Sequence, residues 1–272
     1  MTDPPPGSDD MPEIAIEKTA SPSPIGRLFL TLWIAGIASG LASVPVLVAV
    51  SEAGLRAKPL SWQMATFAAL LGSGVIYAGA IFIGLRLGRP LGLTAPVIEA
   101  WLDRRPLAPF AGALGQGVAL GALIGVVGVV VTVVGGHLSA ATASADEVLP
   151  MWIGVLQALS AGVGEEILFR LGAMCLVVWA VARMLPGEDG RPTTLGMWLA
   201  ILVAAAVFEL AHAPPAADVT AVAMATTKVL TGLRVGLAVA LGWLFWRRGI
   251  EAAMLAHFTY DVVLFYGVVA AL

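Results

Sequence analysis

Charged residues are scarce in this chain. Only 12% of its 272 residues are Asp, Glu, Lys or Arg, well below the roughly 25% of soluble domains, whereas 59% are hydrophobic. The mean hydropathy is +0.92. A net charge of −3 leaves no basic surface of the kind that nucleic-acid binding requires. The composition therefore predicts a multi-pass membrane protein with the lipid bilayer as its surroundings, and it excludes nucleic acid as a partner.

Cysteine is nearly absent as well. The one cysteine, Cys175, cannot form an intrachain disulfide. It lies in an apolar run, where the reactive thiolate is disfavoured. We expect Cys175 to be a small buried hydrophobic side chain rather than a nucleophile.

Long apolar runs are abundant instead, several of them near the roughly 20 residues that a helix needs to cross a bilayer. We expect an all-α, polytopic membrane helix bundle of about seven transmembrane helices, at residues 28–50, 62–85, 110–134, 151–182, 194–212, 219–246 and 250–272. The sixth run contains Gly232, Arg234 and Gly236, which would allow it to divide in two. In the third run, glycines at residues 117, 121 and 125 predict close helix packing in lipid.

Residues 1–27 are rich in Pro, Ser and acidic residues, and we expect a disordered N-terminal tail. This tail lacks a basic region followed by an apolar one, so no cleavable signal peptide is expected. Lys and Arg are concentrated in the tail and in the second, fourth and sixth connections, which lie on one side of the membrane. The connections on the opposite side contain only Arg56 and Lys58. The positive-inside rule then predicts a cytoplasmic N-terminus, and the short loops favour the membrane of a bacterial cell.

The charges inside the apolar runs are unevenly distributed. The first three runs contain no Asp, Glu, Lys or Arg, so the transmembrane domain, residues 28–272, divides into a predicted scaffold and a catalytic core at about 150–272. In the fourth run, Glu165, Glu166 and Arg170 fall within six residues, and each costs about 2.5 to 3.5 kcal/mol to insert. Helical geometry places Glu166 and Arg170 on one face, where they can pair, and rotates Glu165 by about 100° from Glu166. Glu165 is thereby left to face another partner.

Two of the three histidines lie in apolar runs with a companion four residues away on the same helical face. His212 follows Phe208 in the fifth run, and His257 precedes Asp261 in the seventh. Each polar residue alone could serve helix packing. Carboxylates and imidazoles from three separate spans, however, have acid–base capacity beyond what packing needs.

Three short motifs occur in order on these spans: EEILFR at residues 165–170, FELAH at 208–212 and HFTYD at 257–261. They resemble the EExxxR, FxxxH and HxxxN or HxxxD motifs of the CPBP family, the CAAX-protease and bacteriocin-processing membrane proteins that include Rce1-type glutamate intramembrane proteases. The resemblance covers about residues 160–265. It implies an intramembrane endopeptidase without a metal or other cofactor, acting on a peptide or protein substrate. Whether the substrate is lipidated (prenylated) and the oligomeric state are left open.

The resemblance also implies a role for each residue. Glu165 would act as general base on a water that His212 binds, and His257 would hold the oxyanion with Asp261 beside it. Glu166 and Arg170 would form a structural pair, with Phe208 as the first residue of its motif.

Position 261 departs from the more frequent Asn. An ionised aspartate cannot donate a hydrogen bond to an oxyanion, so Asp261 would be protonated or would orient His257 by accepting from its other ring nitrogen. Glu209, next to Phe208, is a further charge, for which we expect pairing with Arg234 or Lys228.

Counting along ideal helices places these groups at different depths. Glu165 lies about 22 Å along its helix and His257 about 10 Å into the last one. The groups can meet only if spans tilt, helix limits shift or the sixth run breaks.

Two other interpretations remain. Glu165, His212 and His257 are acceptable zinc ligands, which would make the protein a metalloprotease, although HExxH is absent. Alternatively, the polar residues form a buried network in a non-catalytic partner-binding or transport protein.

Overall fold

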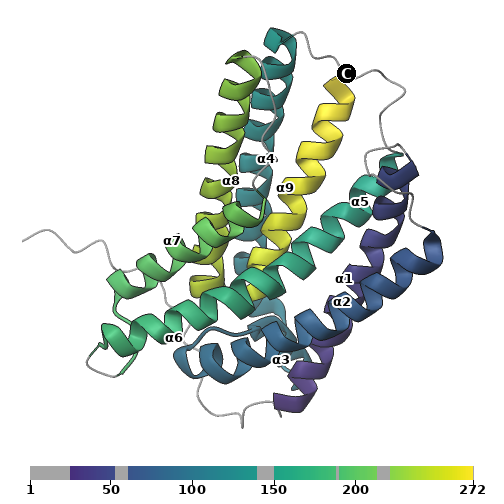
Figure 1. The fold of residues 1–272 in the computed structure, drawn as a ribbon. Coiled ribbons are helices and arrows are strands. Elements are labelled where there is room, and N and C mark those ends of the chain that lie inside the picture. The colour runs from purple at the N-terminus through teal and green to yellow at the C-terminus, as the bar shows by residue number, and fades with distance from the viewer. Residues whose placement is uncertain (1–24, 53–60, 140–149, 188–189, 213–220, 272) are drawn as a thin grey trace, which may run out of the picture.

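The computed structural model of the chain (Figure 1) describes residues 25–52, 61–139, 150–187, 190–212 and 221–271. The structure in these ranges is helical and contains no β-strand. Seven helices are long and apolar enough to cross a membrane: Ile25–Ala49, Trp62–Leu91, Ala108–Gly135, Met151–Met184, Thr194–Ala211, Met224–Arg248 and Ile250–Ala271. The prediction of an all-α membrane bundle with about seven spans is confirmed.

Several spans are composed of more than one helical element. The α-helices are α1 (Ile25–Glu52), α2 (Trp62–Ile83), α3 (Pro96–Leu102), α4 (Ala111–Ser139), α5 (Met151–Ser160), α6 (Cys175–Met184), α7 (Thr194–Ala211), α8 (Ala221–Arg248) and α9 (Ile250–Ala271). Two π-helices, η1 (Gly84–Gly88) and η5 (Ala161–Met174), and two 3₁₀ turns, η2 (Arg89–Leu91) and η3 (Ala108–Phe110), complete the described elements.

Two features of the helices differ from the sequence expectation. The first helix begins at Ile25, so the last three residues of the predicted tail are helical, and residues 1–24 lie outside the described part of the chain. From residue 221 onward, where the structure describes it, the sixth run is one uninterrupted helix, α8, with Gly232 and Gly236 in its interior. A glycine weakens a helix by only about 1 kcal/mol, which the contacts of α8 with α4, α7 and α9 offset.

The fourth span runs obliquely through the bundle (Figure 1). Elements α5, η5 and α6 form one continuous 34-residue helix, much longer than the roughly 20 residues of a perpendicular crossing. It packs against α1 and α2 on one side and against α9 on the other. Because this helix is tilted, Glu165 can lie beside residues near the ends of α7 and α9, which resolves the mismatch in depth.

Small residues bring α4 and α9 close together, as the glycine spacing predicts. A Cβ atom on Gly117 would meet the carbonyl oxygen of Ala252, and one on Gly121 would meet that of Ala256. In lipid, such close approach supplies the van der Waals contacts that hold helices together. Since Ala256 directly precedes His257, this contact also fixes the backbone that carries the histidine.

Candidate active site

A fully buried ion-pair network lies behind the site. Arg170 Nε is 3.3 Å from Glu166 Oε2, and Glu166 Oε1 is 2.8 Å from His257 Nδ1. The side chains of Glu166 and Arg170 are 0% and 1% exposed. Because a carboxylate only accepts, His257 donates its Nδ1–H to Glu166. This bond fixes the ring and turns Nε2 toward Glu165.

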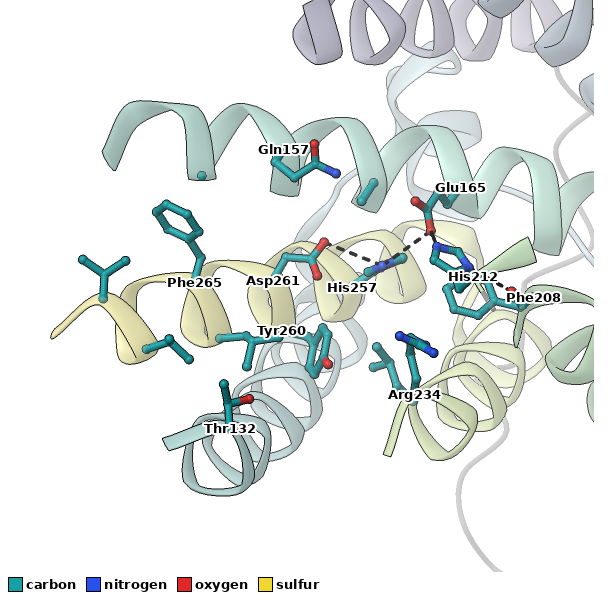
Figure 2. Close-up of a pocket in the computed structure, with 16 residues that line it drawn as sticks. Thr132, Gln157, Glu165, Phe208, His212, Arg234, His257, Tyr260, Asp261 and Phe265 are labelled. Carbon is teal, nitrogen blue, oxygen red and sulfur yellow. Dashed lines mark hydrogen bonds and ion pairs between the residues drawn. The ribbon is translucent and has the colours of Figure 1, made fainter. Parts of the chain in front are cut away.

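Glu165 lies between two imidazoles that come from two other helices (Figure 2). Its Oε2 atom is 3.5 Å from His212 Nε2 and 3.9 Å from His257 Nε2. Glu165 is carried by η5, a π-helix, a rare form that often occurs at functional sites. The structure thus brings together three side chains that lie up to 92 positions apart in the sequence.

His212 is the residue directly after α7. Its Nδ1 atom is 2.8 Å from the carbonyl oxygen of Phe208, and its ring stacks on the Phe208 ring with centroids 4.3 Å apart. Phe208 also meets the ring of His257 edge to face at 6.0 Å, and the Arg170 guanidinium lies 5.2 Å from its centroid. Phe208 therefore packs against Arg170 and against both imidazoles.

Asp261 faces the same ring nitrogen of His257 as Glu165 does. Its Oδ2 atom is 3.7 Å from His257 Nε2, whereas Nδ1 is bound to Glu166. Of the two alternatives expected for Asp261, orientation of His257 through its other ring nitrogen is wrong, because Glu166 already holds that nitrogen. The other alternative, a protonated Asp261, stays a prediction.

These groups line one cavity of about 570 Å³ (Figure 2), a volume typical of small-ligand sites. Its polar end contains Glu165, His212, His257 and Asp261. Its other wall is mostly apolar and is lined by Gly154 of α5, Thr132 of α4, and Leu264, Phe265, Val268 and Val269 of α9. The arrangement juxtaposes acid–base groups with a surface suited to apolar groups.

A second ion pair borders the cavity. Arg234 donates to both carboxylate oxygens of Glu209, at 2.8 and 2.6 Å, and its side chain lines the cavity wall. Of the two partners expected for Glu209, the structure selects Arg234. Lys228 is exposed on the same helix.

Sequence spacing could find only part of this site. The pairs four residues apart follow from helical geometry, but the bond between Glu166 and His257 joins residues 91 positions apart. Gln157 and Tyr260 also line the cavity. Gln157 lies outside the three motifs and Tyr260 at a variable position of the third, so no local pattern in the sequence identifies them. Cys175 is fully buried beside Gly88 and contacts none of these groups, as expected of a structural cysteine.

Among the described residues, no group of three or more His, Cys, Asp and Glu side chains has the arrangement of a metal site. The polar groups of the cavity are instead engaged with one another and with backbone carbonyls.

Comparison with known proteins identifies a related family. The family model described as type II CAAX prenyl endopeptidase Rce1-like matches residues 147–263, whereas no curated protein and no solved structure matches the chain. The matched segment begins just before α5 and ends within α9, so it contains Glu165, His212, His257 and Asp261. The predicted family resemblance is confirmed: residues 147–263 of this membrane protein match the Rce1-like family model.

Proposed function

We propose that the protein is an intramembrane endopeptidase that hydrolyses a peptide bond with a water activated by Glu165. One observation carries the proposal: the Glu165 carboxylate lies 3.5 and 3.9 Å from two imidazole nitrogens at the polar end of a largely apolar cavity. A general base placed within reach of a water and of a second polar group is the arrangement that acid–base catalysis requires.

In this proposal, the hydrogen bond that His212 makes through Nδ1 leaves its Nε2 atom available to bind the attacking water. Because the Phe208 carbonyl only accepts, His212 Nδ1 carries a proton, and the neutral ring directs the Nε2 lone pair to the side of Glu165, where it can accept a hydrogen bond from a water. A water between these atoms donates one hydrogen to each and directs a lone pair at the scissile carbonyl carbon. As the water attacks, its proton passes to Glu165, which later delivers it to the leaving amine nitrogen.

In this scheme, His257 stabilises the negative charge that develops on the carbonyl oxygen. With Nδ1–H donated to Glu166, a doubly protonated His257 presents Nε2–H to the cavity. A preorganised donor of this kind is typically worth about 2.7 to 4 kcal/mol of transition-state stabilisation. Glu166 and Arg170 support the donor without contacting substrate.

The substrate is a peptide or protein segment. The family description, CAAX prenyl endopeptidase, and the apolar wall formed by Leu264, Phe265 and Val268 favour a substrate that carries apolar or lipidated residues beside the scissile bond. Such groups gain about 25 cal/mol for each Å² that they remove from water.

Purified protein with peptide substrates tests the proposal. Glu165→Gln keeps the size of the side chain but cannot accept the proton, so we expect kcat to fall about 10²- to 10⁴-fold. His212→Ala should lower kcat by a comparable factor, while the protein still inserts into the membrane and can be purified. Glu99→Gln, which removes a carboxylate paired with Arg89 outside the cavity, is the matched control and should retain activity.

Three results would contradict the proposal. Retained proteolysis in both Glu165→Gln and His212→Ala would exclude Glu165 as base. Loss of wild-type activity with a chelator and its return with zinc would favour metal-assisted hydrolysis instead. If the wild type has no peptidase activity and Glu165→Gln keeps the cellular phenotype, the protein is a non-catalytic binding or transport protein.

A further inference from the structure

The Glu209–Arg234 pair links the end of α7 to the middle of α8 and takes no part in the proposed reaction. Arg234 Nε and Nη2 each donate to a different oxygen of Glu209, at 2.8 and 2.6 Å. The two side chains are 17% and 29% exposed, so water screens the pair only in part. A bidentate guanidinium–carboxylate contact fixes both distance and orientation, which a single ionic contact does not.

Glu209 is also joined to His212. The backbone N–H of His212 donates to the carbonyl oxygen of Glu209 at 3.0 Å. His212 itself has φ −106° and ψ 4°, outside the α-helical geometry of α7. Residues at a helix end are held by fewer backbone hydrogen bonds than those in its interior. The position of the His212 ring therefore depends on how the last turn of α7 is anchored, and Glu209 anchors that turn to α8.

We infer that Glu209 and Arg234 are positioning residues for His212. By fixing the last turn of α7 against α8, the pair keeps His212 Nε2 at 3.5 Å from Glu165 Oε2, a separation that one shared water can bridge. The consequence for catalysis rests on the proposed function, but the placement of the ring does not. Glu209 occupies a variable position of the FELAH motif and Arg234 lies outside all three motifs, so the motif pattern does not specify this pair.

Breaking the pair should change catalysis more than substrate binding. Arg234→Gln and Glu209→Gln should each lower kcat about 10- to 100-fold with KM little changed, because a small displacement of a catalytic group has a cost of this order. Arg234→Lys keeps the charge but not the bidentate geometry, so its kcat should lie between those of wild type and Arg234→Gln.

Lys228→Gln is the matched control. It removes a cation from the same helix, six residues before Arg234, where the side chain is exposed and does not line the cavity. We expect wild-type kcat and KM for this variant, which separates the loss of the pair from the loss of a positive charge on α8.

The position of the ring can be followed without any assay of activity. The chain has three histidines, so ¹⁵N spectra of histidine-labelled full-length protein in detergent can be assigned with a His137→Gln variant. Arg234→Gln should move the His212 ring signals and leave those of His257 in place, because His257 is held by Glu166. Lys228→Gln should move neither.

Each outcome decides the inference. Wild-type kcat in a folded Arg234→Gln protein, or His212 signals that do not move, would overturn it. If Arg234→Gln does not fold, Arg234→Lys and Glu209→Gln decide by the same two readouts. If the His212 signals move as expected but even the wild type cleaves no peptide, the positioning role stands and the proposed peptidase function fails.

Discussion

At the scale of single residues, the two adjacent glutamates face different surroundings. Glu166 is fully buried and is bound to Arg170 and to His257, whereas Glu165 has 28% of its side chain exposed to the cavity. A buried carboxylate that lost either partner would leave an uncompensated charge, which is strongly destabilising. One glutamate thus maintains the structure of the site, and the other remains available for proton transfer.

Asp261 provides a test at this scale. Since Glu166 fixes His257 through Nδ1, Asp261→Asn should keep the ring in place and add an amide donor at the same position. We expect kcat within about tenfold of wild type, and a larger loss for Asp261→Ala, which removes every polar atom of the side chain. Steady-state kinetics on both variants measures this. A fall of about 10²-fold or more in Asp261→Asn would mean that the carboxylate itself is required.

At the scale of elements, the geometry of the site depends on how α4 and the fourth span (α5, η5 and α6) pack against α9. Residues four apart on one helix could be paired from the sequence, because helical periodicity fixes their positions. The bond from His257 to Glu166 and the order of helices around the cavity could not, because they depend on tilt and on tertiary packing. The pattern of glycines on α4 anticipated close packing but did not identify α9 as the partner.

The contact between Gly121 and α9 yields a prediction with an internal control. A Cβ on Gly121 would meet the carbonyl oxygen of Ala256, whereas one on Gly115 of the same helix would meet nothing within 4 Å. Gly121→Ala should therefore destabilise the protein by about 1 to 3 kcal/mol, the usual cost of overpacking, and should lower activity by shifting His257. Gly115→Ala should leave both unchanged. Thermal unfolding in detergent compares the two, and equal midpoints would contradict the packing argument.

At the scale of the whole molecule, composition and apolar runs were sufficient to predict seven spans, with ends close to those observed. The cytoplasmic location of the N-terminus remains a prediction from the distribution of Lys and Arg. Ideal, untilted helices misplaced Glu165, His212 and His257 in depth, because hydropathy gives the length of a span but not its tilt. The division into a scaffold of three spans and a catalytic core of four stays a prediction. The last four spans all line the cavity, but Thr132 of the third span lines it as well.

The most direct test of the account is a comparison of new peptide ends produced by wild-type protein and by Glu165→Gln. Both proteins would be reconstituted in lipid vesicles with a library of apolar peptides, lipidated and unmodified, and the products would be identified by mass spectrometry. We predict defined cleavage sites with wild-type protein and none with Glu165→Gln, at equal amounts of folded protein. The same cleavage sites at similar rates in both samples would contradict the claim that Glu165 activates the attacking water.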